Sequence, residues 1–465
     1  MKLAKLSLAA MVVAGLASSS FAADTLADAF KNGKVSGELK AWYFDQSADQ
    51  TNGRMNNANI TTTAATLGYV TDTFYGFSLG TTFQGSANAG TAETSAKATF
   101  KNDEYAGGGV LSEAYLAYTL GKTTVKVGRQ FIATPLVSGS GSRIYTEAFQ
   151  GAVIVNTDLP QTTLIGGYVD KFQGRTSSIS KDTNKNIAGT ATAGTLNGDA
   201  PTFRNTAVFT GGASGGMVAQ FDDAYTVGVI NKSITNLSLT AQYAVVKDVT
   251  APLSATTGLV DDVDVYYTEA NYVLPVAGFK LGFDANFRGS HTGDNLKVAQ
   301  LDGTYTAGRI SISELAGFGF SFAAGTVSKD DSVVAGMGNG PTSYTSTMIR
   351  GTSTRMMADT DSYLFAATYD FSKIGVAGLT ALAQYGWTSQ GKNAEMLSTS
   401  GSFVTAPGTG NAADYTNIAV GLTYAVPALK GLTTSLQYET LEKELKSTSA
   451  KTDTDELWFK AGYKF

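Results

Sequence analysis

The sequence predicts an all-β fold, a transmembrane antiparallel up-and-down β-barrel of about 16 to 18 strands, with 18 favoured. Three observations predict this class. Apolar residues recur at every second position in segments of about ten residues. Short breaks and long polar stretches follow these segments in turn. The polar faces of the segments carry charges that a packed core would hold only at great cost.

The last segment shows the alternation most clearly. In LWFKAGYKF, residues 457–465, apolar residues stand at every second position up to the final one. A chain end is normally frayed and polar, so a strand this apolar needs a dry surface for one face. We expect it to pair with the first strand, VSGELKAWYF at residues 35–44, because a closed ring satisfies every backbone amide at membrane depth.

The segment GFKLGFDANFRG shows what the two faces carry. Phe283 and Phe287 lie on one face, while Asp284 and Arg288 lie on the other. If the phenylalanines face lipid, the charged face lines the interior and needs water. Barrels of roughly 16 to 18 strands enclose an aqueous channel, whereas eight-stranded barrels are filled by side chains.

The breaks between segments fall into two classes. Short ones lie at residues 71–76, 119–123, 157–161, 231–236, 274–278, 371–378 and 426–431. Long polar ones lie at residues 46–59, 86–109, 174–204, 328–361, 389–414 and 443–455. Short periplasmic turns and long extracellular loops are typical of outer-membrane barrels. Tyr, Trp and Phe gather at the ends of the segments. Aromatic girdles at the membrane interfaces would produce this pattern, and so would aromatic residues of a packed core.

The amino terminus predicts export. Residues 1–22 have the pattern of a signal peptide, since two lysines precede an apolar run too short to span a bilayer of ~30 Å. We expect residues 23–34 to form a short periplasmic segment with an amphipathic helix, and residues 35–465 to form a single barrel. Removing the signal changes the formal charge from -5 to -7, because it carries two lysines and no acid. This acidic balance argues against a nucleic-acid partner.

Cysteine is absent and histidine occurs once, as His291. Disulfides, thiol nucleophiles, thiolate metal sites and multi-histidine metal sites are therefore excluded. His291 lies in FRGSHTGDN, which we expect to be a surface loop. The sequence predicts no metal site, no cofactor and no enzyme.

One region breaks the repeating plan. VGRQFIATPLVSGSGSRIYTEAFQGAVI, residues 127–154, contains a loop far more apolar than the others, with Ile132, Leu136 and Ile144. A loop exposed above the membrane has no reason to be so apolar. Folded inward against the wall, it would bury that surface and narrow the channel. The predicted fold therefore includes one inward-folded constriction loop.

A signal peptide, the constriction-type segment GRQ…TPLVSGSGSR…FQG and an aromatic carboxyl terminus follow one another in this chain. This order resembles the OprD-type and related major outer-membrane porins of Gram-negative bacteria, over essentially the whole mature chain. The resemblance implies a homotrimeric channel in the bacterial outer membrane, surrounded by its lipids. Members of the family line the lumen with arginines that guide carboxylates, and the candidates here are Arg129, Arg143 and Arg288.

Placed by this resemblance, the inward loop would present hydroxyl groups and both signs of charge at the narrowest point. These pore-lining candidates are Ser138, Ser140, Ser142, Arg143, Tyr145 and Glu147. On the wall, we expect a basic track of Lys126, Lys280 and Arg288 and an acidic track of Glu113, Glu269 and Asp284. Opposed charges set a transverse field that tunes ion preference.

Arg143 is our first choice for a filter residue, because its guanidinium suits a carboxylate or phosphate. The alternative is that Arg143 only pins the loop through a salt bridge. The predicted function is a passive-diffusion porin for small hydrophilic solutes and ions. Two other classes stay open at this point: a barrel enzyme resembling a lipase, for which His291 is the only possible histidine base, and an exported adhesin or structural β-protein.

Overall fold

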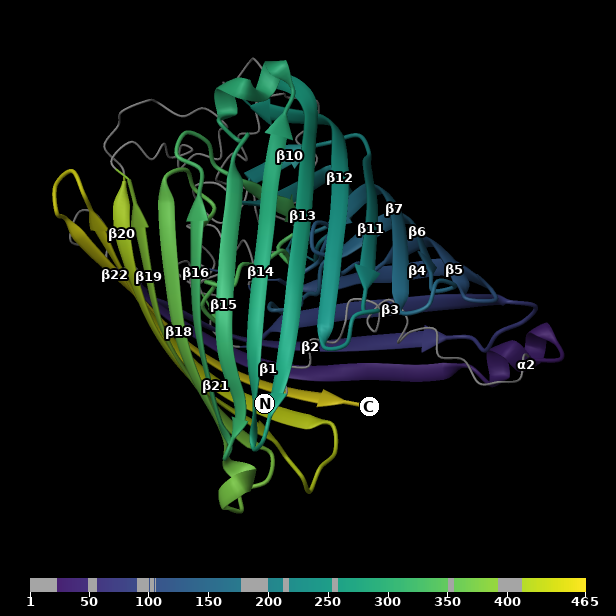
Figure 1. Ribbon diagram of the computed structural model, residues 1–465. Helices are drawn as coiled ribbons and strands as arrows, with labels where there is room; N and C mark the ends of the chain where they lie inside the picture. The colour runs from purple at the N-terminus through teal and green to yellow at the C-terminus, as the bar shows by residue number, and fades with distance from the viewer. Residues whose placement is uncertain are drawn as a thin grey trace.

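A computed structural model describes residues 23–48, 57–89, 100, 104, 106–176, 200–211, 217–252, 258–349, 355–391 and 412–465 of this protein. The predicted signal peptide and parts of several predicted long loops lie outside these ranges. Long antiparallel strands form one sheet that curves around into a ring (Figure 1). Among the described helices, none is long and apolar enough to cross a membrane.

Eighteen of the described strands form the wall. They are β1 (Lys34–Ala48), β2 (Ala58–Val70), β3 (Phe77–Asn88), β4 (Gly108–Leu120), β5 (Thr123–Gln130), β6 (Ala148–Asn156), β7 (Thr162–Gln173), β11 (Ala224–Asn231), β12 (Leu237–Pro252), β13 (Gly258–Val276), β14 (Phe279–Thr292), β15 (Thr304–Leu315), β16 (Phe318–Val327), β18 (Thr360–Asp370), β19 (Leu379–Gln390), β20 (Ala413–Ala425), β21 (Leu432–Leu445) and β22 (Lys451–Lys464). Each pairs antiparallel with the next in this order.

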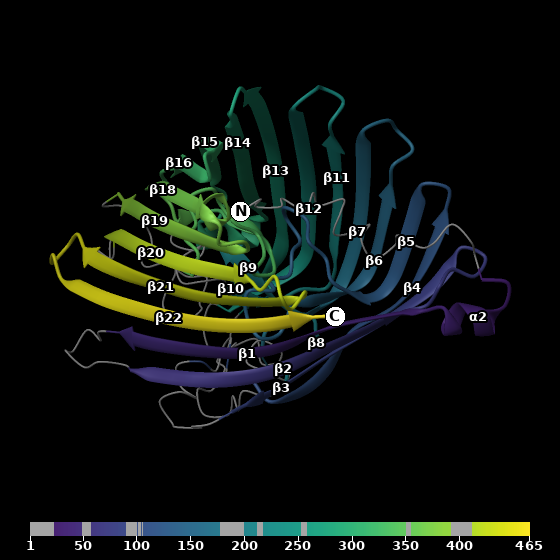
Figure 2. The ribbon, with the colours of Figure 1, turned by 90° about the horizontal axis from the view of Figure 1, so that it is seen from below.

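The ring closes where the last strand pairs with the first. β22 lies antiparallel to β1, with Phe44 opposite Trp458, and the two strands run side by side in the view from below (Figure 2). Beyond the ladder, Gly37 and Phe465 exchange backbone hydrogen bonds of 2.9 and 3.1 Å. The predicted closed barrel, with the favoured count of 18 strands, is confirmed.

The two faces of the wall are sorted as the alternation predicts. On β14, Phe283 and Phe287 are 45% and 40% exposed, whereas Arg288, on the inward face, is 2% exposed. On β22, Leu457 and Phe459 are exposed and Trp458 is buried. The outer surface is therefore apolar, as a surface in contact with lipid must be.

The connections differ at the two ends of the barrel. At one end they are short, comprising residues 71–76, 121–122, 157–161, 232–236, 277–278, 316–317, 371–378 and 426–431. The predicted long loop at residues 443–455 is wrong, because β21 and β22 continue pairing as far as Glu444 and Lys451. Lys451 also bridges Glu442 at 2.9 Å, so cross-strand charge pairs extend this hairpin.

A short helix, α2 (Leu26–Lys31), precedes β1, within the region where an amphipathic helix is expected. Thr25 caps it by accepting a hydrogen bond from the Asp28 N–H at 3.1 Å. The helix lies beside the β2–β3 connection, where the Asp72 N–H donates to the Ala29 carbonyl at 2.9 Å. Leu26 and Phe30 are exposed on it.

Four described strands lie outside the ring order: β8 (Phe203–Arg204), β9 (Thr206–Gly211), β10 (Met217–Gln220) and β17 (Val334–Met337). Two 3₁₀ helices, η1 (Asp294–Ala299) and η3 (Phe371–Ile374), lie in connections. β9 pairs with β17, and both pack with Val137 against inward-facing residues such as Val169 and Val265. Part of the interior is therefore filled, by more inward segments than the one predicted.

An aromatic cluster inside the ring holds the closing seam. Phe44 is fully buried, with its ring 5.0 Å from that of Trp458 and 5.9 Å from that of Trp42, both edge-on. Such edge-to-face pairs add to the energy of apolar burial. Trp458, on the otherwise polar face of the last strand, is therefore a packing residue that ties β22 to β1.

Replacing Phe44 with alanine is expected to destabilise the barrel by about 3–5 kcal/mol, because it leaves a cavity where a buried ring stood. The measurement is the midpoint temperature of unfolding, read from gel electrophoresis as the temperature at which the fast-migrating folded form is converted to the unfolded form. Phe459→Ala is the matched control, since Phe459 is 44% exposed on the outer face of the same seam. A midpoint for Phe44→Ala no lower than that of the control contradicts this role.

Candidate functional site

The loop between β5 and β6, residues 131–147, folds into the barrel and crosses its interior. Gln84 of β3 clamps it, accepting from the Thr146 N–H and donating to the Thr146 carbonyl, both at 2.9 Å. Gln242 of β12 accepts from the Leu136 N–H at 3.0 Å. Because β3 and β12 lie far apart around the ring, the loop is held to widely separated parts of the wall. We call it the first inward loop.

The tip of the first inward loop reaches the closing seam. Lys40 of β1 donates to the Ile144 carbonyl at 3.1 Å, and Lys460 of β22 donates to the Ser142 carbonyl at 2.9 Å. The Arg143 guanidinium lies 4.4 Å over the Trp458 ring, a cation–π contact. Three basic side chains therefore gather where the loop meets the wall.

Arg143 also makes the ion pair that the alternative interpretation requires. Its Nε lies 3.3 Å from Glu104 Oε1, and Glu104 in turn accepts from the Ile144 N–H. The Arg143 side chain nevertheless keeps 14% of its surface exposed. Pinning the loop and facing the interior are thus compatible roles for this residue.

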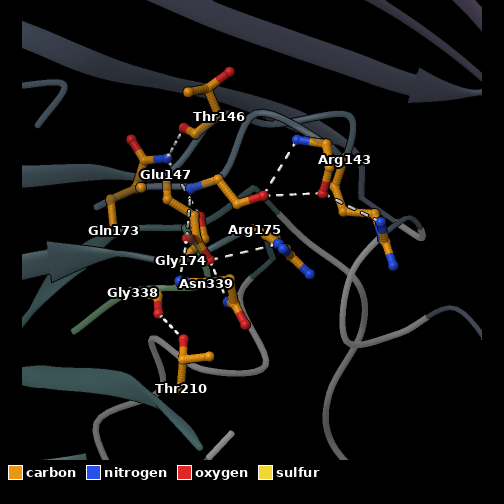
Figure 3. Close-up of polar contacts among 12 residues, drawn as sticks. Arg143, Thr146, Glu147, Gln173, Gly174, Arg175, Thr210, Gly338 and Asn339 are labelled. Atoms are coloured by element: carbon orange, nitrogen blue, oxygen red, sulfur yellow. Dashed lines mark hydrogen bonds and ion pairs between the residues drawn. The ribbon is translucent and has the colours of Figure 1, made fainter. Parts of the chain in front are cut away.

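Glu147 is the central anchor of the first inward loop (Figure 3). Its carboxylate accepts from the Ser140 N–H and the Asn339 N–H at 2.9 Å each, and from the Asn339 side chain. Arg175 lies within ion-pair distance, at 3.5 Å. Glu147 is 0% exposed. It joins three segments of the chain and does not face an open channel.

The prediction that the whole Ser138–Glu147 stretch presents its side chains to solutes therefore needs correction. Tyr145 and Glu147 are buried, and Ser138 and Ser140 are nearly so. Their polar groups satisfy the backbone of the folded loop; the Tyr145 hydroxyl, for instance, donates to the Gly108 carbonyl at 2.7 Å. Of the six loop candidates, Ser142 and Arg143 keep the most exposure.

A second segment, described at residues 328–349 and 355–359, also turns inward, although its polar composition suggests an external loop. Val333, Val334 and Ala335 are fully buried in it. Arg288 of β14 donates to the carbonyls of Ala335 and Thr342, at 3.0 and 3.1 Å. Arg288 is thus a buried anchor and not part of a solvated basic track. We call this segment the second inward loop.

The second inward loop is fastened to another part of the wall at its far end. Glu439 of β21 accepts from the Thr347 hydroxyl at 2.6 Å and from the Ile349 N–H at 2.8 Å. Gln384 of β19 accepts from the Met348 N–H at 2.9 Å. The segment therefore crosses from β14 to β19 and β21. The two inward loops therefore cross the interior between different parts of the wall.

An acidic group of side chains lies on β13 and β14. Asn271 donates to Glu269 at 3.1 Å and to Asp284 at 2.6 Å. Arg309 of β15 forms a two-nitrogen contact with one Asp284 oxygen, at 2.6 and 2.8 Å. Tyr344 of the second inward loop donates to Glu269, and burial, reinforced by the Glu269 charge, raises the pKa of its hydroxyl. The hydroxyl therefore remains a donor at neutral pH.

The basic and acidic groups lie on opposite sides of the barrel. From β1, which carries Lys40, nine strand pairings lead to β13, which carries Glu269, in either direction around the ring. Inward-facing polar residues between them, such as Gln384 and Gln437, are partly exposed. The interior beside the loops is therefore polar and wet.

The other wall candidates have different surroundings. Lys126 lies 4.0 Å over the Tyr115 ring, and Glu113 accepts from the Thr82 hydroxyl at 2.6 Å. Lys280 pairs with Glu314 at 2.7 Å beside the short connections. Lys280 is thus separated along the chain from the Arg288 anchor and belongs to the rim.

Lys40 and Lys460 are the functional candidates that sequence reasoning missed. Both stand on the polar face of a strand beside a tryptophan, in KAW and WFK. The sequence did offer a signal for them. Trp42 and Trp458 stand on the polar faces of the first and last strands, which were expected to pair, so a contact between these faces could have been predicted. Lys460 lies 4.2 and 4.4 Å from the Trp458 and Trp42 rings.

The sequence places His291 in a loop, but in the structure it is the second-last residue of strand β14. It is exposed there, and its Nδ1 lies 3.3 Å from Asp302 Oδ2. Within the described ranges, no group of three or more His, Cys, Asp or Glu side chains is placed to hold a metal ion. The interior described above offers charge and hydrogen bonds at a passage rather than a closed pocket.

A closed ring of eighteen strands, apolar outside and polar inside, with inward loops across its lumen, defines a porin-type membrane channel. The model of the family Campylobacter major outer membrane protein matches residues 1–288. The chain belongs to this family. It is a porin channel of the bacterial outer membrane.

Solved structures with the same fold support this conclusion. The chain is similar to Pseudomonas aeruginosa OpdQ, at 17% identity and a TM-score of 0.67, over 94% of this chain and 99% of that one. It is similar to P. aeruginosa OccK1 (OpdK), at 15% identity and 0.68, with the same coverage. OpdK with vanillate gives 14% and 0.69, again over 94% and 99%. No curated protein sequence matches the chain. The family match and the shared fold favour neither the enzyme nor the adhesin class.

Proposed function

We propose that the channel passes small hydrophilic solutes and ions by passive diffusion, and that opposed charges at the two inward loops set its selectivity. The observation that carries this proposal is the opposite placement of Lys460 and Arg143 on one side and Glu269 and Asp284 on the other. A passing ion meets a transverse field there, in a space narrowed by the loops.

The mechanism needs neither a cofactor nor a chemical step. Ser142 and the partly exposed part of Arg143 supply donors on the basic side. On the acidic side, Asp284 is paired with Arg309, so that Glu269 and Asp284 together carry less than two full charges toward the passage. The proposed field therefore arises between the basic group at the closing seam, which we call the basic edge, and the partly neutralised carboxylates of β13 and β14, which we call the acidic edge.

Conductance of the purified protein in a planar bilayer tests the function directly. We expect stepwise openings of constant size, because each barrel is a preformed aqueous path. A protein that shows the heat-dependent gel shift of a folded barrel yet conducts no ions would contradict diffusion through the lumen.

Arg143→Ala tests the basic edge. A unit charge about 6 Å from a passing ion in water contributes roughly 0.7 kcal/mol, and salt at about 0.15 M roughly halves this energy. Because the charge acts with opposite sign on cations and anions, the cation-to-anion permeability ratio should rise about threefold. The reversal potential in a salt gradient measures it. Lys297→Ala is the control, because Lys297 is an exposed cation on η1, paired with Asp294 at 2.6 Å. Equal reversal potentials for Arg143→Ala and the unchanged protein remove Arg143 from the filter.

The same proposal includes a homotrimer in contact with outer-membrane lipids, and an exported precursor from which residues 1–22 are removed. The lipid-facing aromatic and aliphatic residues of the wall support the membrane contact. Mass measurement of the purified channel, after extraction in mild detergent, tests both the assembly and the cleavage. Monomers, or a mass that retains residues 1–22, would contradict these points.

A further inference from the structure

A hollow of about 500 Å³ lies on the outer face of the barrel, over β16 and β18 to β22. Small side chains form its floor: Ala367 of β18 pairs with Ala383 of β19, and Ala381 lies in the neighbouring outward row. In the same rows, Phe320 and Tyr438 are large and exposed, so they stand higher than the alanines. We call this hollow the outer groove.

The outer groove runs obliquely from the short-connection end toward the middle of the wall. Its first row passes through paired residues from Phe318, at the start of β16, to Leu436, the fifth residue of β21. Five or six neighbouring strands are separated by four or five spacings of about 4.8 Å, and on a wall tilted near 45° these give a depth of about 14–17 Å along the membrane normal. This depth matches half of a hydrocarbon core of ~30 Å, which is one leaflet.

Aromatic side chains close the groove on its far side. The next outward row contains Phe365 opposite Tyr385, and beyond it Tyr363 stacks on Trp387 with ring centroids 5.4 Å apart and planes at 13°. At the other end, the Phe318 and Tyr369 rings lie 4.5 Å apart beside the short connections. The groove therefore belongs to the leaflet on the side of the short connections, which is the periplasmic leaflet.

Basic residues lie at the periplasmic end of the groove. Lys373 is in η3, directly after β18, and Lys430 is in the β20–β21 connection. The two connections are neighbours, since the Ala425 N–H donates to the Gly378 carbonyl at 3.0 Å. Asp370, the nearest acid in sequence, accepts from the Ser372 N–H at 2.9 Å and so caps η3. Two exposed ammonium groups suit the phosphate of a lipid at this depth.

We propose that the outer groove holds one acyl chain of a glycerophospholipid of the periplasmic leaflet, with its phosphate beside Lys373 and Lys430. The groove is continuous with the lipid-facing surface, one leaflet deep, apolar along its length and basic at its headgroup end. Lipid at this site exchanges more slowly than lipid around the rest of the barrel, because the chain has protein on three sides.

Native mass spectrometry of the full-length porin, extracted in mild detergent, tests this proposal. We expect one phospholipid to be retained per chain. Ala383→Phe fills the floor and should lower the retained fraction about tenfold, since the chain loses its buried contacts. The control is Ala285→Phe, which places the same ring on the outer face of β14 between Phe283 and Phe287, away from the groove.

A second variant leaves the groove itself unchanged. Lys373→Gln combined with Lys430→Gln should reduce retention of anionic phospholipid more than that of zwitterionic phospholipid. The gel shift and the single-channel conductance of every variant report whether the barrel has folded. Retention that is absent in the unchanged protein, or equal in Ala383→Phe and Ala285→Phe, overturns the proposal. Loss of oligomers in Ala383→Phe without loss of lipid also overturns it, and assigns the groove to a second copy of the chain.

Discussion

Replacing Glu147 with glutamine is expected to open the channel wider. The carboxylate is fully buried and accepts from the Ser140 and Asn339 backbone N–H groups, with Arg175 at 3.5 Å. An amide of the same shape removes the charge and turns one acceptor into a donor that faces other donors. Breaking a buried charged network from one side costs about 3–5 kcal/mol. That loss releases the contact between the two inward loops, because Asn339 belongs to the second and Glu147 to the first.

Single-channel recording measures this effect. Glu147→Gln should give a larger mean conductance and more current noise, since a loop that is no longer fastened samples several positions. Glu314→Gln is a suitable control, because it removes a carboxylate from an exposed pair with Lys280 at the rim. If both variants conduct as the unchanged protein does, Glu147 does not hold the constriction.

Neutralising the acidic edge should shift selectivity in the opposite direction from Arg143→Ala. In Glu269→Gln combined with Asp284→Asn, the passage loses two carboxylates and Arg309 loses its partner at 2.6 Å. The change amounts to two positive charges in a confined space, and the permeability ratio should move toward anions by up to about tenfold. This is the largest selectivity change that we expect from wall substitutions.

Reversal potentials at low and high salt measure that shift and its screening. The effect should shrink as the ionic strength rises, because the Debye length falls to about 3 Å at 1 M. Asp294→Asn serves as the control, since Asp294 is exposed on η1 and pairs with Lys297. A shift toward cations, or none, would show that Glu269 and Asp284 do not face the ion path.

The fold could be predicted almost entirely from the sequence. Phe283 and Phe287 alternating with Asp284 and Arg288 specify two faces, because side chains of a strand point alternately to its two sides. The apolar alternation up to Phe465 required a partner strand and lipid, and β1 supplies the partner. The hairpin at residues 443–455 was missed because above the membrane neither face needs to be apolar, so pairing there leaves no periodic signal.

The constriction could be predicted only in part. The first inward loop is apolar in sequence, with Ile132 and Leu136, and its inward position followed from that. The second carries only the short apolar run Val333–Met337 in a polar stretch, so its burial depends on distant groups such as Arg288 and Glu439. The sequence of the loop alone does not show that side chains of other strands will bind it, so its inward position could not be predicted.

Period-two alternation and local composition are sufficient to specify a closed membrane barrel with a polar interior and an apolar loop that narrows it. Which charged side chains are buried depends on the tertiary structure. Glu147 and Arg288 have the residue types of a filter but serve as buried anchors, whereas Lys460 and Arg143 meet at the closing seam and stay partly exposed. This is so because the role of a side chain depends on its desolvation and its partners, and strands far apart in the chain set both.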